Sequence, residues 1–289
     1  MIIPPVVPTH PGVYSRAGWS QSFWSRSDLI DGSIYTVTNV NRVRDEIAIV
    51  HSSDLHVDDG YTARAYGGDG TRGLSVVLEA AREVAVDLVL LVGDVFEHNR
   101  LPIDLLERTA RLLNDATLPV VILPGNHDPL IAESAYVRGA IAEPANVHVL
   151  GITDDEAVVF ADLDLEIWGR AHRDYIDMAP LGKARPRTTR WQIAAAHGHY
   201  EPEPDMATTL RPSWLISDHE IAATGADYVA LGHWNRHARV GNGQVPAYYS
   251  GSPDLARTVN LVRLIDGGEV VVARQPLKFE TLMSDLGET

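Results

Sequence analysis

The sequence predicts an α/β fold in which two β-sheets pack face to face with helices outside them. Two observations lead to this prediction. Residues 45–128 alternate short apolar runs with segments of helical periodicity, and the second half of the chain is dominated by short strand-like runs. An alternation of strand, helix and strand is typical of parallel βαβ units with right-handed crossovers.

The elements of the first half follow from its periodicity. Strands are predicted in the runs EIAIVHSSD at 46–54, DLVLLVGD at 87–94 and LPVVILPGNHD at 118–128, each of which ends in polar residues. Helices are predicted at 73–85 and 103–116, where apolar residues recur every three or four positions. In parallel sheets of this kind, functional residues gather in the loops beyond the carboxyl ends of the strands.

The second half predicts a second, more antiparallel sheet with little helix apart from 216–224. The expected strands are at 147–150, 157–160, 164–168, 192–196, 227–231, 246–250, 260–265 and 269–273. Residues 1–44 show no sustained period, and we expect an irregular N-terminal extension before a domain at 45–289. One hypothesis for this segment is that translation begins near Val40 or Val43.

Composition excludes several classes of protein. The 289 residues have a formal net charge of −15, which disfavours a generic DNA-binding surface because such a surface must attract a polyanion. There is no cysteine, so disulfides, thiolate metal sites and a cysteine nucleophile are excluded. No apolar run approaches the roughly 18 residues that span a bilayer, and the N-terminus does not resemble a signal peptide. We expect a cytoplasmic protein.

Polar clusters follow five of the predicted strands. They are SSDLH, VGDVFEHN, PGNHD, AAAHGHY and LGHWNRH. Asp54 and His56, at positions i and i+2 of an extended segment, can face a single ion. Carboxylate oxygen, imidazole nitrogen and amide oxygen together suit Mn, Fe or Zn, and an aspartate between two such ions can bridge them.

The series Asp54-x-His56, Gly93-Asp94, Gly125-Asn126-His127-Asp128, His197 and Gly232-His233 resembles the calcineurin-like metallophosphoesterase superfamily. Within it, GDVFEHNR, LPGNHDPL, ANVHVLG, IWGRAH, YVALGHW and YSGSPD resemble the branch of DNA repair exonucleases of the SbcD type. The resemblance runs from about Ile47 to about Leu277. It implies a four-layer αββα sandwich with two mixed sheets flanked by helices, and two divalent metal ions at the carboxyl edges of the central strands.

The resemblance also implies roles for individual residues. One ion would be held by Asp54, His56 and the bridging Asp94, and the other by Asp94, Asn126, His197 and His233. His127 matches the catalytic histidine, and Asp128 would orient its imidazole. The nucleophile would be a hydroxide activated by both ions. We expect the ions to be Mn²⁺, with Fe or Zn as alternatives.

The sequence departs from the family pattern in two places. The last motif, Gly-His-x-His in the family, here ends in Asn235, which must complete the first ion site or leave it one ligand short; His237 is a second candidate. Glu97 stands where some nucleases of the branch carry histidine, and the adjacent His98 is an alternative. An amide oxygen binds a borderline metal more weakly than imidazole does, so Asn235 predicts looser binding of that ion.

Candidate substrate-binding residues are His199, beside the metal motif, and Arg257, after YSGSPD. Arg236 is a further candidate for a substrate phosphate, because a guanidinium can bind phosphate through two hydrogen bonds. Trp234, between His233 and Asn235, is a candidate for stacking on a base. His172 is expected at the rim, where a pocket role and a surface role are both open.

These features predict a hydrolase acting on ester bonds, a metal-dependent phosphoesterase. Its substrate would be a phosphodiester or phosphomonoester, either a nucleotide or a nucleic acid end, and a DNA exonuclease in DNA repair is one form of this prediction. A nuclease of this branch would have an ATPase partner subunit. The alternatives are a small-molecule or cyclic nucleotide phosphodiesterase or phosphatase, and a non-catalytic binding module whose metal site is weakened at Asn235.

Overall fold

The computed structural model describes residues 27–30, 33–36, 46–58, 60–204 and 213–279. The chain divides into two units, Met1–Val43 and Arg44–Thr289. In the first unit, β1 (Ser27–Ile30) and β2 (Ser33–Thr36) pair as antiparallel strands. The rest of the segment predicted to be irregular lies outside the described residues.

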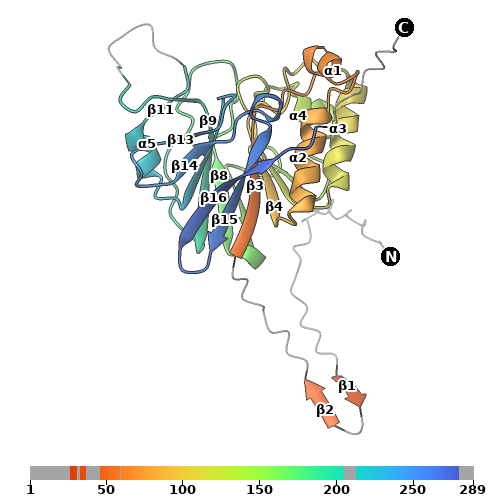
Figure 1. The fold of residues 1–289 in the computed structure, drawn as a ribbon, viewed down its shortest axis with the longest axis vertical. Helices are drawn as coiled ribbons and strands as arrows, with labels where there is room; N and C mark the ends of the chain where they lie inside the picture. The colour runs from red at the N-terminus through yellow and green to blue at the C-terminus, as the bar shows by residue number, and fades with distance from the viewer. Residues whose placement is uncertain (1–26, 31–32, 37–45, 59, 205–212, 280–289) are drawn as a thin grey trace, which may run out of the picture. The chain divides into compact units, whose positions relative to one another are not determined.

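The second unit contains two six-stranded sheets (Figure 1). The first sheet has the order β16-β15-β3-β4-β5-β6, and the second has the order β13-β14-β12-β9-β8-β7. The strands of the first sheet are β3 (Glu46–Ser52), β4 (Leu88–Val92), β5 (Val120–Leu123), β6 (Val147–Val149), β15 (Thr258–Ile265) and β16 (Glu269–Pro276). Those of the second are β7 (Ala157–Phe160), β8 (Leu165–Gly169), β9 (Trp191–His197), β12 (Tyr228–Gly232), β13 (Ala238–Val240) and β14 (Ala247–Tyr249).

Helices and two short strands complete the unit. The helices are α1 (Tyr61–Ala65), α2 (Arg72–Glu83), α3 (Ile103–Asp115), α4 (Ala135–Arg138), α5 (Asp218–Ala223) and α6 (Pro253–Ala256), with a 3-10 turn at Ala161–Leu163. The short strands β10 (His199–Tyr200) and β11 (Leu215–Ile216) pair in parallel. Among the described helices, none has the length and apolar character that crossing a membrane requires.

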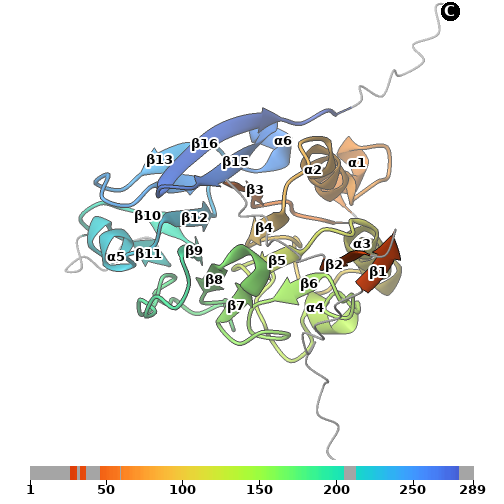
Figure 2. The same cartoon turned by 90° about the horizontal axis from the view of Figure 1, so that it is seen from below.

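Three buried clusters show that the unit has four layers. Alternate residues of β3 and β4 point to opposite faces, so that Val50 packs beneath α2 and α3 while Ile49 packs between the two sheets. In the second sheet, Ala195 faces the first sheet and Ala196 packs on the side of α5. Figure 2 shows α2 and α3 on one side of the sheets and α5 on the other. The predicted αββα sandwich is therefore confirmed.

The predicted strands after residue 44 are present, but β10, β11 and β13 were not predicted, and the assignment of strands to sheets was wrong in part. The antiparallel pair β15 and β16 belongs to the first sheet, where β15 pairs with β3, and β6 also joins this sheet beside β5. The centre of the second sheet is parallel, and only its outer pairs β7/β8 and β13/β14 are antiparallel. Strand periodicity gives the face of each residue but not its partner strand, which explains the error.

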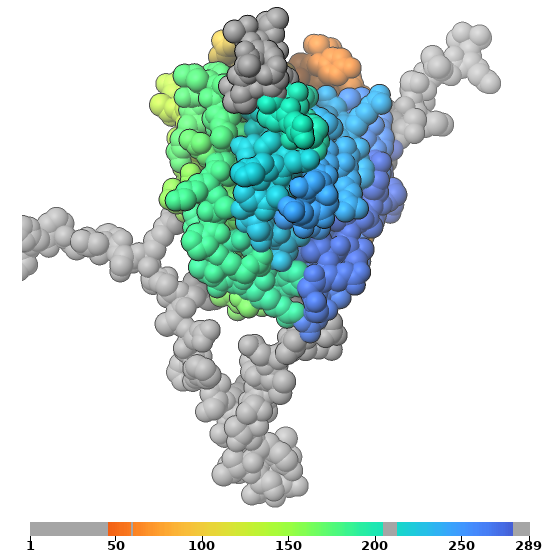
Figure 3. All heavy atoms as spheres, turned by 90° about the vertical axis from the view of Figure 1, so that its left-hand side faces the viewer, coloured from red at the N-terminus to blue at the C-terminus, as the bar shows by residue number. Residues whose placement is uncertain are grey.

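Figure 3 shows the face of the unit formed by the second half of the chain, coloured green to blue.

Candidate metal centre

The loops after β3 and β4 are held side by side by backbone hydrogen bonds. The amide of Asp54 donates to the carbonyl of Gly93 (3.1 Å), and the amide of His56 donates to the carbonyl of Asp94 (3.0 Å). These bonds run on beyond the parallel pairing of the two strands. The first two predicted motifs therefore meet at one edge of the sheet, as their positions at strand ends predict.

Four of the predicted ligands have a left-handed backbone. The φ angles are 54° at Asp54, 48° at His56, 51° at Asp94 and 105° at His233. For residues other than glycine such angles are uncommon, cost on the order of 1 kcal/mol each, and concentrate at functional sites. The chain turns sharply at each of these positions, and surrounding hydrogen bonds maintain the turns.

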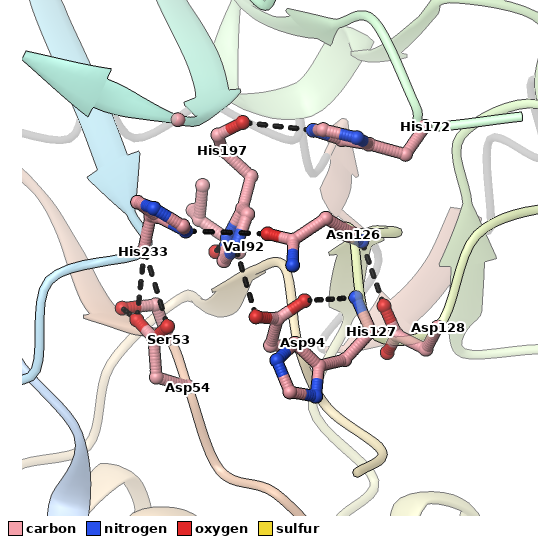
Figure 4. A network of polar contacts seen from close by, with 12 residues as sticks. Ser53, Asp54, Val92, Asp94, Asn126, His127, Asp128, His172, His197 and His233 are labelled. Atoms are coloured by element: carbon pink, nitrogen blue, oxygen red, sulfur yellow. Dashed lines mark hydrogen bonds and ion pairs between the residues drawn. The ribbon is translucent and has the colours of Figure 1, made fainter. Parts of the chain in front are cut away.

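Asp94 lies at the centre of the site (Figure 4). Its Oδ1 accepts a hydrogen bond from the amide of His127 (2.9 Å), and its Oδ2 lies 3.0 Å from Nε2 of His197. Burial disfavours the charge on Asp94, but His197 outweighs this and holds the pKa of the carboxyl below its ordinary value. Asp94 is therefore a buried anion between two histidine-bearing loops.

Two candidate ligand groups share this carboxylate. Within each group, one nitrogen or carboxylate oxygen per residue lies within 4.8 Å of those of the other members. One group is Asp54, His56 and Asp94; the other is Asp94, His197 and His233. A carboxylate common to two groups is the arrangement of a bridged two-ion site.

Asn126 joins the second of these groups. Its Oδ1 lies 3.2 Å from Nδ1 of His233 (Figure 4). Burial and the neighbouring His197 lower the pKa of His233 to about 4, so its imidazole is neutral at pH 7 and keeps a lone pair for a metal.

The first group includes a carboxyl whose environment resists charge. Asp54 accepts hydrogen bonds from Ser53 Oγ (2.5 Å) and from the amide of His233 (3.0 Å to Oδ2). Burial raises the pKa of Asp54 to about 6, and the charge on nearby Asp94 acts in the same direction. Two buried carboxylates this close need a positive charge between or beside them.

Close backbone approach explains two of the motif glycines. A Cβ at Gly93, where φ is 81°, would collide with the ring of His197. A Cβ at Gly125 would collide with the side chain and amide nitrogen of Asp94. The glycines of the first sheet therefore allow its loops to lie directly against the ligands.

His127 lies beside the ligand groups with its ring partly open to solvent. Its Nδ1 lies 2.9 Å from the carbonyl oxygen of Glu97. A carbonyl only accepts, so Nδ1 carries a proton and Nε2 is the ring nitrogen available to a substrate. The side chain is 40% exposed, which gives such a substrate access.

The predicted role of Asp128 was wrong. Its Oδ1 accepts from the amide of Gly125 (2.7 Å), and its Oδ2 accepts from the amide of Phe96 (3.0 Å) and the hydroxyl of Tyr136 (2.6 Å). These donors leave no hydrogen bond between this carboxylate and the ring of His127. Asp128 instead fixes the loop backbones, and the carbonyl of Glu97 orients the imidazole.

Comparison with known proteins agrees with this geometry. Residues 47–237 match the family model described as calcineurin-like phosphoesterase. The chain belongs to the calcineurin-like phosphoesterase family. It is 24% identical over 247 residues to the SbcD subunit of the nuclease SbcCD of Bacillus subtilis (strain 168), and the alignment covers 71% of this chain and 61% of that protein.

Two solved structures resemble the fold. The crystal structure of the protein TT1561 of Thermus thermophilus superposes with a TM-score of 0.50 at 14% identity, covering 79% of this chain and 98% of that one. A second structure gives a TM-score of 0.50 at 13% identity, covering 80% of this chain and 99% of that one. As a calcineurin-like phosphoesterase, the protein is a hydrolase that acts on phosphoester bonds.

The family is metal-dependent, and the residues present fit divalent ions. The surroundings of His197, which is completely buried, show how these residues fit an ion. Its Nδ1 lies 2.9 Å from the carbonyl of Val92 and so carries the proton, while Nε2 has no hydrogen-bond partner and faces Asp94. Burial disfavours a charge on His197, but the carboxylate of Asp94 outweighs this and raises the pKa of the imidazole to about 9, so the place favours a positive charge beside Asp94. A divalent ion bound to Nε2 would supply that charge in place of the proton.

Asn235 and His237, the two candidates for completing the first ion site, lie in different surroundings. Asn235 is exposed and lines a pocket beside His233. His237 packs against the ring of Tyr248, with ring centroids 5.9 Å apart, and among the described residues no candidate ligand group of this phosphoesterase includes it.

Glu97, where the sequence departs from the family pattern, contacts two histidines of the site. Its Oε2 lies 2.8 Å from Nδ1 of His56, and its Oε1 lies 3.7 Å from Nδ1 of His127. The three residues form a further candidate ligand group. The alternative, His98, instead accepts a hydrogen bond from the amide of Arg100 (3.2 Å). Only the departure from the family pattern at position 97 could have indicated Glu97.

The predicted substrate-binding residues separate in space. His199 lines the pocket beside His233, whereas the exposed Arg257 places its guanidinium 4.2 Å from the ring centroid of Phe279 and is not part of the pocket lining. His172, expected at the rim, is completely buried, and its Nε2 lies 2.8 Å from the carbonyl of His197. Its role is to hold the backbone of a candidate ligand.

Proposed function

We propose that this phosphoesterase hydrolyses nucleotidyl phosphodiester bonds, including those at DNA ends, with two divalent ions held by the groups that share Asp94. The observation that carries the proposal is this shared buried carboxylate with a partly exposed histidine, His127, directly beside it. When bound, two such ions neutralise the phosphate charge and activate water as the nucleophile.

The protein residues have separate tasks in this proposal. Asp54, His56 and Asp94 hold one ion; Asp94, Asn126, His197 and His233 hold the other. Asn235 is proposed as a weak additional ligand of the first ion.

His127 serves as the general acid in this proposal. Its Nδ1–H is held by the carbonyl of Glu97, so a second proton, taken up on Nε2, can be donated to the departing oxygen, and the imidazolium that carries it can stabilise the charge of the transition state.

The nuclease form of the proposal is supported by the similarity to the SbcD subunit of the nuclease SbcCD, although the chain spans 61% of that protein's length. Like that protein, the chain would then act with a partner subunit, for which we propose an ATPase. We propose Mn²⁺ as the ion, since nitrogen and oxygen ligands together suit it.

A second candidate is a phosphodiesterase or phosphatase for small nucleotides. The net charge of −15 favours it, because a long polyanion is repelled more strongly than a single nucleotide.

Hydrolysis of bis-p-nitrophenyl phosphate, p-nitrophenyl phosphate and linear DNA with added Mn²⁺ tests the proposal. We expect diester cleavage that is lost in Asp94→Asn, which keeps the shape of the side chain but removes its charge, and kept in Asp162→Asn, at an exposed residue. Preference for the monoester would favour a phosphatase. No turnover with any divalent ion, combined with unchanged ion binding in Asp94→Asn, would refute the enzyme proposal.

A further inference from the structure

A pocket adjoins the candidate metal centre on the side of the second sheet. It has a volume of about 440 Å³ and is lined by His199, His233, Trp234, Asn235 and Arg236. This volume falls within the range of about 300–1,000 Å³ that is usual for small-molecule sites. His233 belongs both to the pocket and to the ligand group with Asp94, so a molecule held by its phosphate at the ions extends into this space.

One wall of the pocket is a rigid aromatic surface. The indole of Trp234 stacks on the ring of Tyr249, with centroids 4.3 Å apart and planes 8° from parallel. Tyr249 is completely buried, and its hydroxyl donates to the carbonyl of Gly198 (2.7 Å). Trp234 itself is only partly buried. The indole plane is therefore fixed before a ligand arrives, as a stacking platform for a base requires.

The pocket also offers hydrogen-bond donors. Nε1 of Trp234 donates to Nδ1 of His199 (3.2 Å). Because an indole nitrogen only donates, Nδ1 of His199 must accept, and the proton of the neutral imidazole lies on Nε2. His199 thus keeps an N–H for the carbonyl groups of a base.

Arg236 supplies a positive charge at the same place. Its side chain is exposed, and among the residues that the structure describes it has no carboxylate partner. An unpaired guanidinium beside the ion ligands, in a chain of net charge −15, is suited to a phosphate that flanks the base.

We propose that this pocket binds the nucleoside attached to the scissile phosphate, with its base on Trp234 and a phosphate oxygen near Arg236. The inference rests on the proposed phosphodiesterase function and identifies the part of the site that would distinguish nucleotidyl esters from simple alkyl or aryl phosphodiesters.

Matched esters test the inference. Thymidine 5′- and 3′-p-nitrophenyl phosphate share their leaving group with methyl p-nitrophenyl phosphate, which has no base. We expect at least one thymidine ester to be preferred by about 10-fold or more in kcat/KM, and this preference to fall by about 10-fold in Trp234→Leu and to return in Trp234→Phe.

The contribution of Arg236 is tested with Arg236→Gln. Arg239→Gln is its matched control, because Arg239 is also exposed but lies over the ring of Tyr248 outside the pocket lining.

Binding without turnover separates this inference from the proposed function. Calorimetry with thymidine 5′-monophosphate and with inorganic phosphate, in Mn²⁺, should show tighter binding of the nucleotide, and Trp234→Leu and Arg236→Gln should each weaken it by about 10-fold. Equal affinities for the two ligands, or equal losses on the methyl and thymidine esters in Trp234→Leu, would overturn the inference even if the enzyme hydrolyses diesters. Tight nucleotide binding without hydrolysis would support it while refuting the proposed function.

Discussion

The two sheets contribute different chemistry to the site. The edge of the first sheet supplies both carboxylates, Asp54 and Asp94, on loops held together by backbone hydrogen bonds. The edge of the second sheet supplies His197 and His233, whose imidazoles reach across towards those carboxylates. The first edge thus supplies both carboxylates together with His56, whereas the second edge adds only nitrogen ligands, so the group of Asp94, His197 and His233 forms only when the sandwich is assembled.

The two edges also differ in openness. Asp54 and Asp94 are buried, whereas the segment from His233 to Arg236 becomes progressively exposed and lines the pocket. The first edge therefore supplies the carboxylates that would hold the ions, and the second edge supplies the pocket that would select the substrate bound at those ions.

The largest expected effect is at the contact between the edges. Gly93→Ala places a Cβ against the ring of His197 and also strains a backbone at φ 81°. We expect the free energy of unfolding to fall by about 3 kcal/mol or more, as measured by urea denaturation. Gly68→Ala is the matched control, since φ is 98° there but a Cβ meets nothing within 4 Å. Similar losses in the two variants would mean that backbone strain alone, and not the contact between the edges, sets the cost.

A second prediction concerns His51, a buried residue of β3 whose Nδ1 lies 2.9 Å from the hydroxyl of Tyr228 on β12. Burial lowers its pKa from 6.5 to about 3. Above pH 6.5 the imidazole of His51 is neutral in both the folded and the unfolded chain. Between pH 6.5 and about 3 it is protonated in the unfolded chain but stays neutral in the folded chain. The free energy of unfolding should therefore fall by about 2 kcal/mol from this group between pH 7 and pH 5.

The measurement is urea denaturation at both pH values for the wild type, His51→Asn and the exposed control His219→Asn. Asparagine keeps a polar atom near the position of Nδ1 but does not titrate, so the loss between pH 7 and pH 5 should shrink in His51→Asn alone. Contributions from other buried histidines, such as His172, are common to all three proteins and cancel. An unchanged pH dependence in His51→Asn would contradict the prediction.

A third prediction sharpens the role of the first edge. Glu97→Gln keeps the size of the side chain but removes the charge beside His56 and His127. Because carboxylates that contact metal-binding histidines orient them, we expect Mn²⁺ affinity to weaken by about 10-fold, as measured by calorimetry. Glu133→Gln, at an exposed residue, is the control. Equal affinities in wild type and Glu97→Gln would show that this carboxylate does not support the ion site.

These differences explain what the sequence could reveal. The residues at strand ends, such as Asp54 and His197, could be predicted because the carboxyl ends of parallel strands meet at one edge. The pairing of β15 with β3 could not, since periodicity does not identify partner strands across such a separation in sequence. The role of Asp128 depends on which donors its oxygens meet in the folded loops, and adjacency to His127 in sequence gave the wrong partner. Tyr249, the support of Trp234, carries no sequence signal beyond an ordinary strand residue.

The smallest expected effect is at Asn235, on the open edge. Imidazole is a stronger donor than an amide oxygen to a borderline metal, so Asn235→His should tighten Mn²⁺ binding by a few-fold, about 1 kcal/mol or less, in calorimetry. Asn242→His, on an exposed turn, is the control for adding a histidine to the surface. Unchanged affinity in Asn235→His would place Asn235 in the pocket alone. The first ion would then be held only by the buried edge, and the open edge would serve substrate selection without sharing in the first ion site.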